Sequence, residues 1–378
     1  MKKIQGSEAI LKSLIGENIE MIFGYPGGAI MPIYDSLYNY MDKITHILTR
    51  HEQGAIHAAQ GYSRVTGKVG VCFATSGPGA TNLITGLADA QIDSTPLVCI
   101  TGQVPSQLLG TDAFQESDII GISMPVTKWN YQITNANEIA EVMSKAFYIA
   151  VSGRPGPVLI DITKDAQFSE IEFKYKKCEK IRSYHPYPII RKTKIKEAAK
   201  IINNSKKPLI LVGQGVLISN AEDELRQLSE KTGIPVASTL LGLSAISCHH
   251  KNYVGYLGMH GNYGPNLKTN DADLLIAIGM RFDDRVTGDT SKYGINAKII
   301  HIEIDPSEID KIIKTDVAIN GDAKEAIINL LPHLKENQHK NWINEFRICD
   351  KIEYEKIIDK EINVVEDKIL MADVINRI

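Results

Sequence analysis

Short apolar segments alternate with segments of helical pattern along the first half of the chain. The helical segments lie at 51–66, 78–93 and 138–151. The apolar segments have the length of buried strands, and they lie at 21–23, 44–48, 69–74, 96–101 and 157–160. Strands that alternate with helices predict a parallel sheet that is covered by helices on both faces.

The same alternation begins again near Thr193. A helix is predicted at about 221–231, and strands are predicted at 208–212, 234–237, 273–278 and 298–304. Between the two patterns, residues 168–192 are rich in lysine and arginine and contain two prolines, Pro186 and Pro188. This composition favours a solvated linker over a binding surface.

The two patterns predict the α/β fold class, with two consecutive three-layer domains that each contain a parallel sheet. We expect a first domain at 1–168, a linker at 169–191 and a second domain at 192–335. Residues 336–378 are charged and helical, without a strand pattern, and we expect them to lead into a further domain. A chain of 378 residues is long enough for two ordinary domains.

The composition of the chain argues against several classes of function. The chain has 42 basic and 45 acidic residues, and its net charge of −3 argues against nucleic acid or an anionic membrane as the main partner. Its five cysteines are scattered and form no CxxC pair, which is typical of reduced thiols in a cytoplasmic protein. No apolar signal segment follows Lys2 and Lys3, and the uncharged run 69–88 contains a turn, so we expect no membrane span.

Two features of the first domain could carry chemistry. The Gly-Pro-Gly turn at 77–79 joins a predicted strand to a helix, where glycines allow a ligand to approach the backbone and the helix N-terminus favours an anion. Such turns also serve only as connections. Glu52 follows a predicted strand, at the end of the sheet where open α/β folds bind ligands. Its alternative role is a first-turn glutamate that is favoured by the helix dipole.

Other charged or metal-type residues are less specific. His51 and His57 are six residues apart, which does not match the spacing of the zinc-protease helix, and we expect no metal site in this chain. Four charges in the segment 281–285 follow a predicted buried strand. They could form a structural ion-pair cluster or contact a phosphate or flavin, and composition alone does not separate the two.

Taken together, several ordered motifs resemble thiamine-diphosphate enzymes, and within them the acetolactate synthase family. The segments that resemble the wider superfamily are FGYPGGA at 23–29, RHEQGA at 50–55 and ATSGPGATN at 74–82. Those typical of acetolactate synthases are GTDAFQE at 110–116, SGRPGP at 152–157, GMHG at 258–261 and RFDDRVTG at 281–288. The similarity extends from about residue 4 to residue 321.

The resemblance implies a first domain that binds the aminopyrimidine of thiamine diphosphate and a Rossmann-like second domain that binds FAD. Glu52 matches the glutamate that hydrogen-bonds a pyrimidine nitrogen and so promotes removal of the reactive thiazolium proton. The other implied catalytic positions are a backbone donor and groups that line the pocket or bind substrate: Gly28, Phe114, Gln115, Lys164 and Arg285. The implied flavin contacts are Arg154, Gly213, Gly215, Thr239, Leu240, Leu257, Gly258, Met259, His260, Gly279, Met280, Arg281, Phe282, Asp283, Glu303, Ile304 and Asp322.

The family's third domain, whose Gly-Asp-Gly motif holds Mg²⁺ and the diphosphate, has no counterpart here. Gly-Asp occurs at 288–289 and 321–322, but neither pair is followed by glycine. We therefore expect this polypeptide to be inactive, or nearly so, when it is alone. The resemblance implies pyruvate and 2-oxobutyrate as substrates, a homodimer or tetramer, and in some members a small regulatory subunit.

Three alternatives remain open from the sequence. The first is another thiamine-diphosphate carboligase or decarboxylase, such as an FAD-free catabolic acetolactate synthase, a glyoxylate carboligase or a pyruvate oxidase. The second is a non-catalytic remnant that binds FAD or forms dimers. An NAD-dependent dehydrogenase is disfavoured, because no complete GxGxxG motif opens a helix.

Overall fold

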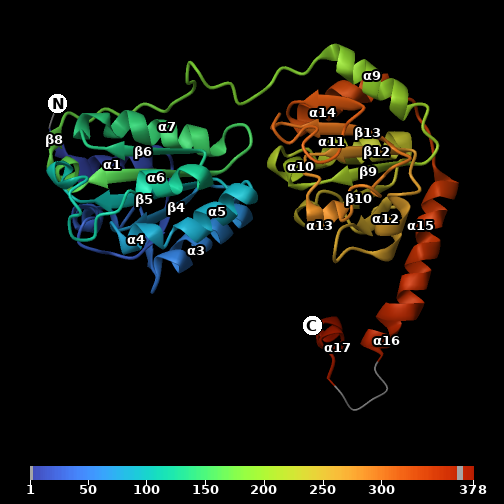
Figure 1. Cartoon of the computed structure of the whole chain (residues 1–378), viewed down its shortest axis with the longest axis horizontal. Coiled ribbons are helices and arrows are strands. Elements are labelled where there is room, and N and C mark those ends of the chain that lie inside the picture. Colours follow the sequence, from blue (N-terminus) through green and yellow to red (C-terminus); the bar gives the residue numbers. More distant parts are fainter. Residues whose placement is uncertain (1–2, 364–368) are drawn as a thin grey trace. The chain divides into compact units, whose positions relative to one another are not determined.

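The computed structural model describes residues 3–363 and 369–378 and divides the chain into two compact units. The first unit is Met1–Pro186 and the second is Tyr187–Ile378, and Figure 1 shows the secondary structure of each. Residues 172–191, which span the boundary, contain no helix or strand. No helix in the described residues is long and apolar enough to cross a membrane.

The first unit contains a six-stranded parallel sheet with the strand order β3-β2-β4-β5-β7-β6. Its strands are β2 (Met21–Gly24), β3 (Thr45–Leu48), β4 (Gly70–Ala74), β5 (Leu97–Gln103), β6 (Trp129–Ile133) and β7 (Pro157–Thr163). Its α-helices are α1 (Gly6–Gly16), α2 (Met31–Leu37), α3 (Glu52–Thr66), α4 (Pro78–Thr81), α5 (Ile84–Ile92), α6 (Ile119–Ser123), α7 (Ile139–Val151) and α8 (Lys164–Phe168). The 3₁₀ turns are η1 (Tyr38–Tyr40), η2 (Ser106–Leu108), η3 (Met124–Val126) and η4 (Ala136–Glu138).

Alternating side chains of each strand divide this unit into two cores. On β4, Phe73 packs in a cluster with residues of α1, α2 and α7, while Cys72 packs on the other face with residues of α3 and α5. Both faces are apolar, as expected for a parallel sheet between two layers of helices. A short antiparallel pair, β1 (Ile4–Gln5) with β8 (Glu170–Ile171), joins the two ends of the unit.

The second unit contains another six-stranded parallel sheet, with the order β11-β10-β9-β12-β13-β14. Its strands are β9 (Pro208–Val212), β10 (Val236–Ser238), β11 (Tyr253–Tyr256), β12 (Leu274–Ile278), β13 (Lys298–Glu303) and β14 (Val317–Asn320). Its helices are α9 (Lys192–Ile202), α10 (Gln214–Ile218), α11 (Glu222–Thr232), α12 (Tyr263–Lys268), α13 (Asp284–Thr287), α14 (Ala323–Leu330) and α15 (Lys340–Glu353), with 3₁₀ turns η5 (Leu240–Gly242) and η6 (Leu331–His333). Counted along the chain, the order is 3-2-1-4-5-6, which is the strand order of dinucleotide-binding folds.

Helices predominate among the described residues that follow the second sheet. Trp342 and Phe346 of α15 are buried against the sheet, and the Trp342 indole donates to the Pro208 carbonyl. The π-helical turn η7 (Tyr354–Ile358), α16 (Asp359–Ile362) and α17 (Met371–Arg377) follow. α15 is therefore part of the second unit.

The predicted α/β class with two parallel-sheet, three-layer domains is confirmed. The sequence did not predict β6, β11 or β14, which are edge strands. Edge strands are partly exposed, so they lack the continuous apolar run that identifies a buried strand. The predicted helix 78–93 consists of two helices, α4 and α5.

Candidate functional site

The first unit has a topological switch point between β2 and β4. The chain leaves β2 toward β3 on one side, then crosses back to β4 on the other. In open α/β sheets the crevice beyond the carboxyl ends of such strands binds ligands. The turns that follow these strands, 25–28 and 75–77, lie at this crevice, and Glu52 follows the adjacent β3.

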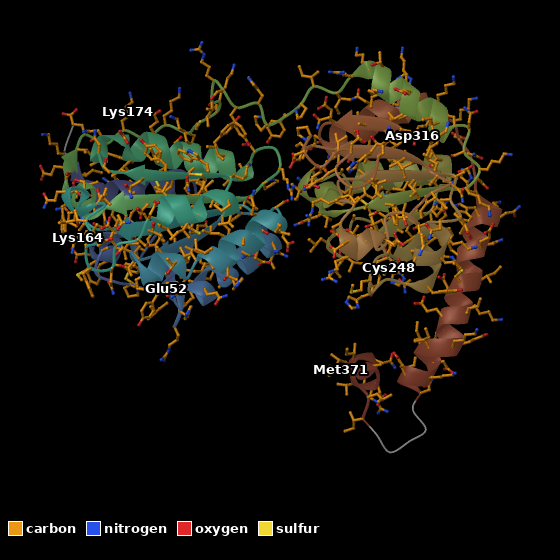
Figure 2. All side chains as sticks on the ribbon, in the orientation of Figure 1. Glu52, Lys164, Lys174, Cys248, Asp316 and Met371 are labelled. Carbon is orange, nitrogen blue, oxygen red and sulfur yellow. The ribbon has the colours of Figure 1, made fainter. Side chains whose placement is uncertain are left out.

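Glu52 begins α3, and its side chain is buried rather than solvated, with 8% exposure. Its Oε2 accepts a hydrogen bond from the Asn82 amide at 2.9 Å. A Cβ added to Gly79 would lie 2.7 Å from the Thr75 methyl and 3.2 Å from Glu52 Oε1, so the glycine allows Thr75 and the carboxylate to pack closely against α4. Figure 2 shows Glu52 on its helix in the first unit. A glutamate whose only role was a favourable interaction with the helix dipole would be exposed to solvent. The burial therefore favours a ligand-binding role.

The two turns at the switch point contact one another beside Glu52. A Cβ on Gly27 would lie 2.5 Å from the Thr75 side chain, and the Ala29 amide donates to Thr75 Oγ1 at 3.1 Å. Gly28, between them, has no atom within 4 Å of its Cβ position. The turn after β2 is thus held against the turn after β4, while the backbone of Gly28 borders open space.

The glycines, the buried carboxylate and the open space fit the pyrimidine end of thiamine diphosphate. Asn82 also belongs to this cluster, although the sequence analysis assigned it no role. The signal was present, because Asn82 ends the 74–82 motif and lies one helical turn after the start of α4. The cluster presents a carboxylate that is shielded from bulk water.

Replacing Asn82 by alanine is expected to lower the free energy of unfolding by about 1–3 kcal/mol, because it leaves the buried Glu52 carboxylate without its amide donor. Urea unfolding of the chain measures this difference. The paired variant Asn82→Ala with Glu52→Gln is expected to recover part of the loss, since the charge that needed the donor is then absent. Equal unfolding free energies for Asn82→Ala and the wild type would contradict this interaction.

Phe114 and Gln115 lie on the loop 104–118, which follows β5. Phe114 is 89% exposed, and the Gln115 backbone has a φ of +58°, in the left-handed region. The carbonyl of Gln115 would lie 2.5 Å from a Cβ on Gly77, so this loop touches the switch-point turn. Gly77 itself has a φ of +57°, which explains the glycine there. The backbone of Gln115 is therefore adjacent to the site, while the Phe114 ring is in solvent.

Lys164 starts α8, directly after β7, and is half-buried. Figure 2 labels it in the first unit, on a different element from Glu52. Arg154 lies in the turn before β7, where its Nε donates to Ser94 Oγ at 2.9 Å and its Nη2 reaches the Ile92 carbonyl at 3.4 Å. The roles of Lys164 at a substrate entrance and of Arg154 at a flavin stay predictions.

The second unit has its own switch point, between β9 and β12. The Gly215 amide donates to the Gly279 carbonyl at 2.9 Å, so the turns that follow these strands are joined. A Cβ on Gly213 would lie 2.3 Å from the Gly279 carbonyl, and one on Gly215 would lie 2.6 Å from the Gly279 Cα. Only glycine allows this approach of the two backbones, which fits a dinucleotide crevice.

Several other predicted flavin residues lie in the segments that follow β10 and β11. The Met259 amide donates to the Arg285 carbonyl at 2.7 Å, and Arg285 Nη1 contacts Met259 Sδ at 3.5 Å. This joins the 257–260 segment to α13, and Leu257 is buried while Gly258 and His260 are not. Leu240 and Met259 are 66% and 60% exposed, which leaves two large apolar side chains in solvent. Exposed apolar side chains beside a dinucleotide crevice fit contact with a planar ligand.

Three polar side chains that were predicted to contact the flavin also cap helices or turns. Asp283 accepts from the Arg285 and Val286 amides, Asp322 accepts from the Glu325 amide, and Thr239 accepts from the Gly242 amide. Their side chains therefore have a local role in the fold that the family motif did not reveal. The Arg281–Asp283 and Arg285–Asp284 pairs, both 3.8 Å apart, are partly solvated and stabilise little.

Glu303 ends β13 and Ile304 follows it, and the sequence did not reveal the role of a histidine on the same strand. Glu303 is buried, and its Oε1 accepts from the Asp305 amide at 3.1 Å. His301 is fully buried, and its Nε2 lies 2.9 Å from the Met280 carbonyl, between Gly279 and Arg281. Burial lowers the pKa of His301, so the imidazole is neutral and Nε2 carries the proton that it donates. Its contact with the ring of Phe282 also supports that segment.

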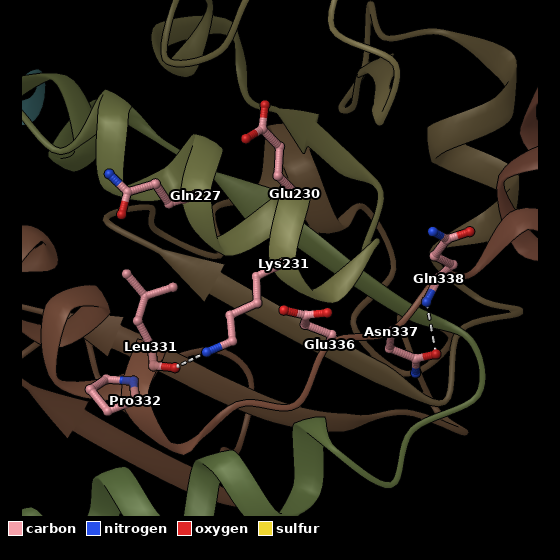
Figure 3. A pocket seen from close by; sticks show the side chains of 8 residues that line it. All are labelled: Gln227, Glu230, Lys231, Leu331, Pro332, Glu336, Asn337 and Gln338. Carbon is pink, nitrogen blue, oxygen red and sulfur yellow. Dashed lines mark hydrogen bonds between the residues drawn. The ribbon is translucent and has the colours of Figure 1, made fainter.

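A depression of about 840 Å³ lies elsewhere on the second unit, between α11 and the segment from η6 to residue 338. Figure 3 shows its lining, including Lys231, whose Nζ donates to the Leu331 carbonyl at 2.8 Å. None of the predicted flavin residues lines it. In the described residues, no group of three or more His, Cys, Asp or Glu side chains could hold a metal ion.

Comparison with known proteins agrees with this architecture. Residues 4–122 match the thiamine pyrophosphate enzyme N-terminal TPP binding domain, and residues 195–330 match the thiamine pyrophosphate enzyme central domain. The acetolactate synthase large subunit of Corynebacterium glutamicum is 51% identical over 337 residues, which are 89% of this chain and 54% of that protein. The chain is a homologue of the acetolactate synthase large subunit.

Relatives from two other organisms show a similar identity and a similar partial coverage. The probable acetolactate synthase large subunit of Methanococcus aeolicus is 46% identical over 99% of this chain and 65% of its own length. The acetolactate synthase large subunit of Haemophilus influenzae is 44% identical over 94% of this chain and 64% of its own length. The chain thus spans between about half and two-thirds of these relatives, over their thiamine pyrophosphate N-terminal and central domains.

Proposed function

We propose that this chain supplies the pyrimidine-binding and flavin-binding parts of an acetolactate synthase. In the proposed reaction two pyruvates, or pyruvate and 2-oxobutyrate, form an acetohydroxy acid and carbon dioxide. The observation that carries the proposal is Glu52, a buried carboxylate that lies against Gly79 at a topological switch point and is oriented by Asn82.

The residues around Glu52 would hold the pyrimidine and take part in the transfer of one proton. When bound, thiamine diphosphate supplies the electron sink that decarboxylation of a 2-oxo acid requires. The Glu52 carboxylate would offer Oε1 to a ring nitrogen, while Asn82 holds Oε2. Because the side chain is buried, water does not compete for that hydrogen bond.

In the second unit, the crevice between β9 and β12 would hold FAD. Gly213, Gly215 and Gly279 let the two turns pack against each other at the base of this crevice, and the exposed Leu240 and Met259 would cover part of the planar ring. Arg285, beside Met259, would face the second substrate's carboxylate. In this proposal FAD undergoes no net redox change in the main reaction and acts largely as structure.

The other parts of the proposal concern assembly. We propose a homodimer or homotetramer, with a small regulatory subunit as a further possible partner. The Mg²⁺ that accompanies the diphosphate would need oxygen ligands, and the described residues hold no cluster that supplies them.

The purified 378-residue polypeptide is expected to bind FAD but to form no acetolactate when it is mixed with thiamine diphosphate, Mg²⁺, FAD and pyruvate. The reason is that Glu52 and its neighbours would contact only the pyrimidine, and the described part of the chain holds no cluster that could bind the metal of the diphosphate. Flavin absorbance after gel filtration measures binding, and a colorimetric acetoin assay measures product. A colourless protein would contradict the flavin assignment, and clear turnover would contradict the expected inactivity.

A further inference from the structure

A buried carboxylate in the first unit is linked to the loop that carries Phe114 and Gln115. Asp161, on β7, is fully buried. Thr101 donates to its Oδ1 at 2.6 Å, and the amides of Gln103 and Gln132 donate to its Oδ2 at 3.1 and 2.8 Å. Burial raises the pKa of Asp161, and these three hydrogen bonds oppose that shift. A carboxylic acid that is fully buried within a sheet is costly, so its presence needs a physical reason.

Gln103 connects Asp161 to the loop. Its Nε2 donates to the Ser117 carbonyl at 3.2 Å as well as to Asp161, and its Oε1 accepts from the Val104 amide at 2.9 Å. The amide group is therefore fixed in one orientation, with both of its Nε2 protons used. Because Val104 and Ser117 are at the two ends of the loop 104–118, one side chain holds both ends.

The loop itself has the geometry of a segment that is held by its surroundings. Asp112 and Gln115 have φ values of +57° and +58°, which are unfavourable for residues other than glycine. Ser106, near the start, donates its backbone amide and hydroxyl to the Asp165 carboxylate at 2.9 and 2.6 Å. Such a backbone persists only when anchors outside the loop fix it. The anchored loop places the Gln115 carbonyl against Gly77.

We propose that Asp161 is a positioning residue of the catalytic site, which acts through Gln103 to hold the 104–118 loop, and with it Phe114 and Gln115, against the switch-point turn. The catalytic meaning of the loop rests on the function proposed above. The hydrogen-bonded connection between Asp161 and the loop does not rest on that function, because it involves only hydrogen bonds within this unit.

Hydrogen exchange of the intact chain, without added cofactor, tests the link. Asp161→Leu removes the carboxylate, and Gln103→Met removes the side-chain amide that connects the carboxylate to the loop. Each is expected to raise amide exchange in residues 106–118 by roughly 3- to 10-fold, the factor of one lost hydrogen bond. Asp161→Asn keeps an oxygen for the two glutamine amides, so it is expected to stay within about 2-fold of the wild type.

Thr101→Val is the matched control. It removes the donor to Oδ1, on the side of Asp161 away from Gln103, and is expected to lower overall stability without a selective change in the loop. If Asp161→Leu does not fold, Gln103→Met tests the same connection to the loop. Loop exchange that is unchanged in Gln103→Met, or that rises equally in Thr101→Val, would overturn the proposal.

The same series separates this proposal from the proposed function. A loop that loosens in Asp161→Leu and Gln103→Met, and recovers in Asp161→Asn, supports the positioning role whether or not the chain binds thiamine diphosphate. Binding of that cofactor is measured independently, by calorimetric titration of the wild type. A normal titration together with an unaffected loop would leave the proposed function intact and remove only the role of Asp161.

Discussion

Changing Glu52 to glutamine is expected to reduce acetolactate formation by roughly 10²–10⁴-fold in any active assembly that contains this chain, the usual range for a general acid–base group. Glutamine has nearly the same shape, and its carbonyl can still accept the hydrogen bond from Asn82. What it loses is the ability to hold a proton. The measurement is kcat for acetolactate at saturating thiamine diphosphate, so that weaker cofactor binding does not enter the comparison.

Glu20→Gln provides the control for this substitution. Glu20 is exposed on the surface of the same unit, where it pairs with Lys68 at 2.7 Å, so its change to glutamine is expected to leave kcat within about 2-fold. Undiminished turnover in Glu52→Gln would remove this carboxylate from the mechanism. Equal losses in both variants would point to damage of the fold.

The second large effect is expected for Gly279→Ala, with flavin affinity about 10- to 100-fold lower than in the wild type. Gly279 has a φ of +57°, and an added Cβ would lie 2.6 Å from the Gly215 Cα. The alanine must therefore push apart the turns that follow β9 and β12, which form the proposed FAD crevice. Quenching of flavin fluorescence during titration of each protein measures the dissociation constant.

Gly288→Ala separates backbone strain from this contact. Gly288 has a φ of +55°, almost the same as Gly279, but no atom lies within 4 Å of its Cβ position. Both variants incur the cost of placing alanine at a positive φ, on the order of 1–3 kcal/mol. Only Gly279→Ala disturbs the crevice, so only it is expected to lose flavin strongly. Similar flavin affinities in the two variants would contradict a binding site between β9 and β12.

The central strands could be predicted from the sequence because they are buried on both faces. β4 and β9, for example, are continuous apolar runs between turns, and their predicted positions agree with the structure to within a residue. β6 reads WNYQI and is half-exposed at an edge, so its polar positions concealed it. The pattern of apolar residues therefore gave the fold class but not the full strand order.

The candidate site was only partly predictable for a different reason. The motif resemblance identified Glu52, but local pattern could not distinguish a buried carboxylate from a solvated one at a helix start. That distinction depends on Asn82 and Gly79, which come from α4 and meet Glu52 only after β4 has paired beside β2. His301 was missed because a histidine inside an apolar strand gives no signal for its contact with the Met280 carbonyl.

A crystal structure of the chain with thiamine diphosphate bound tests the central claim most directly. We expect an oxygen of Glu52 to lie within hydrogen-bond distance of a pyrimidine ring nitrogen, with Asn82 bound to the other oxygen. A pyrimidine bound away from α3, or a Glu52 side chain that points into water while the cofactor is present, would contradict it.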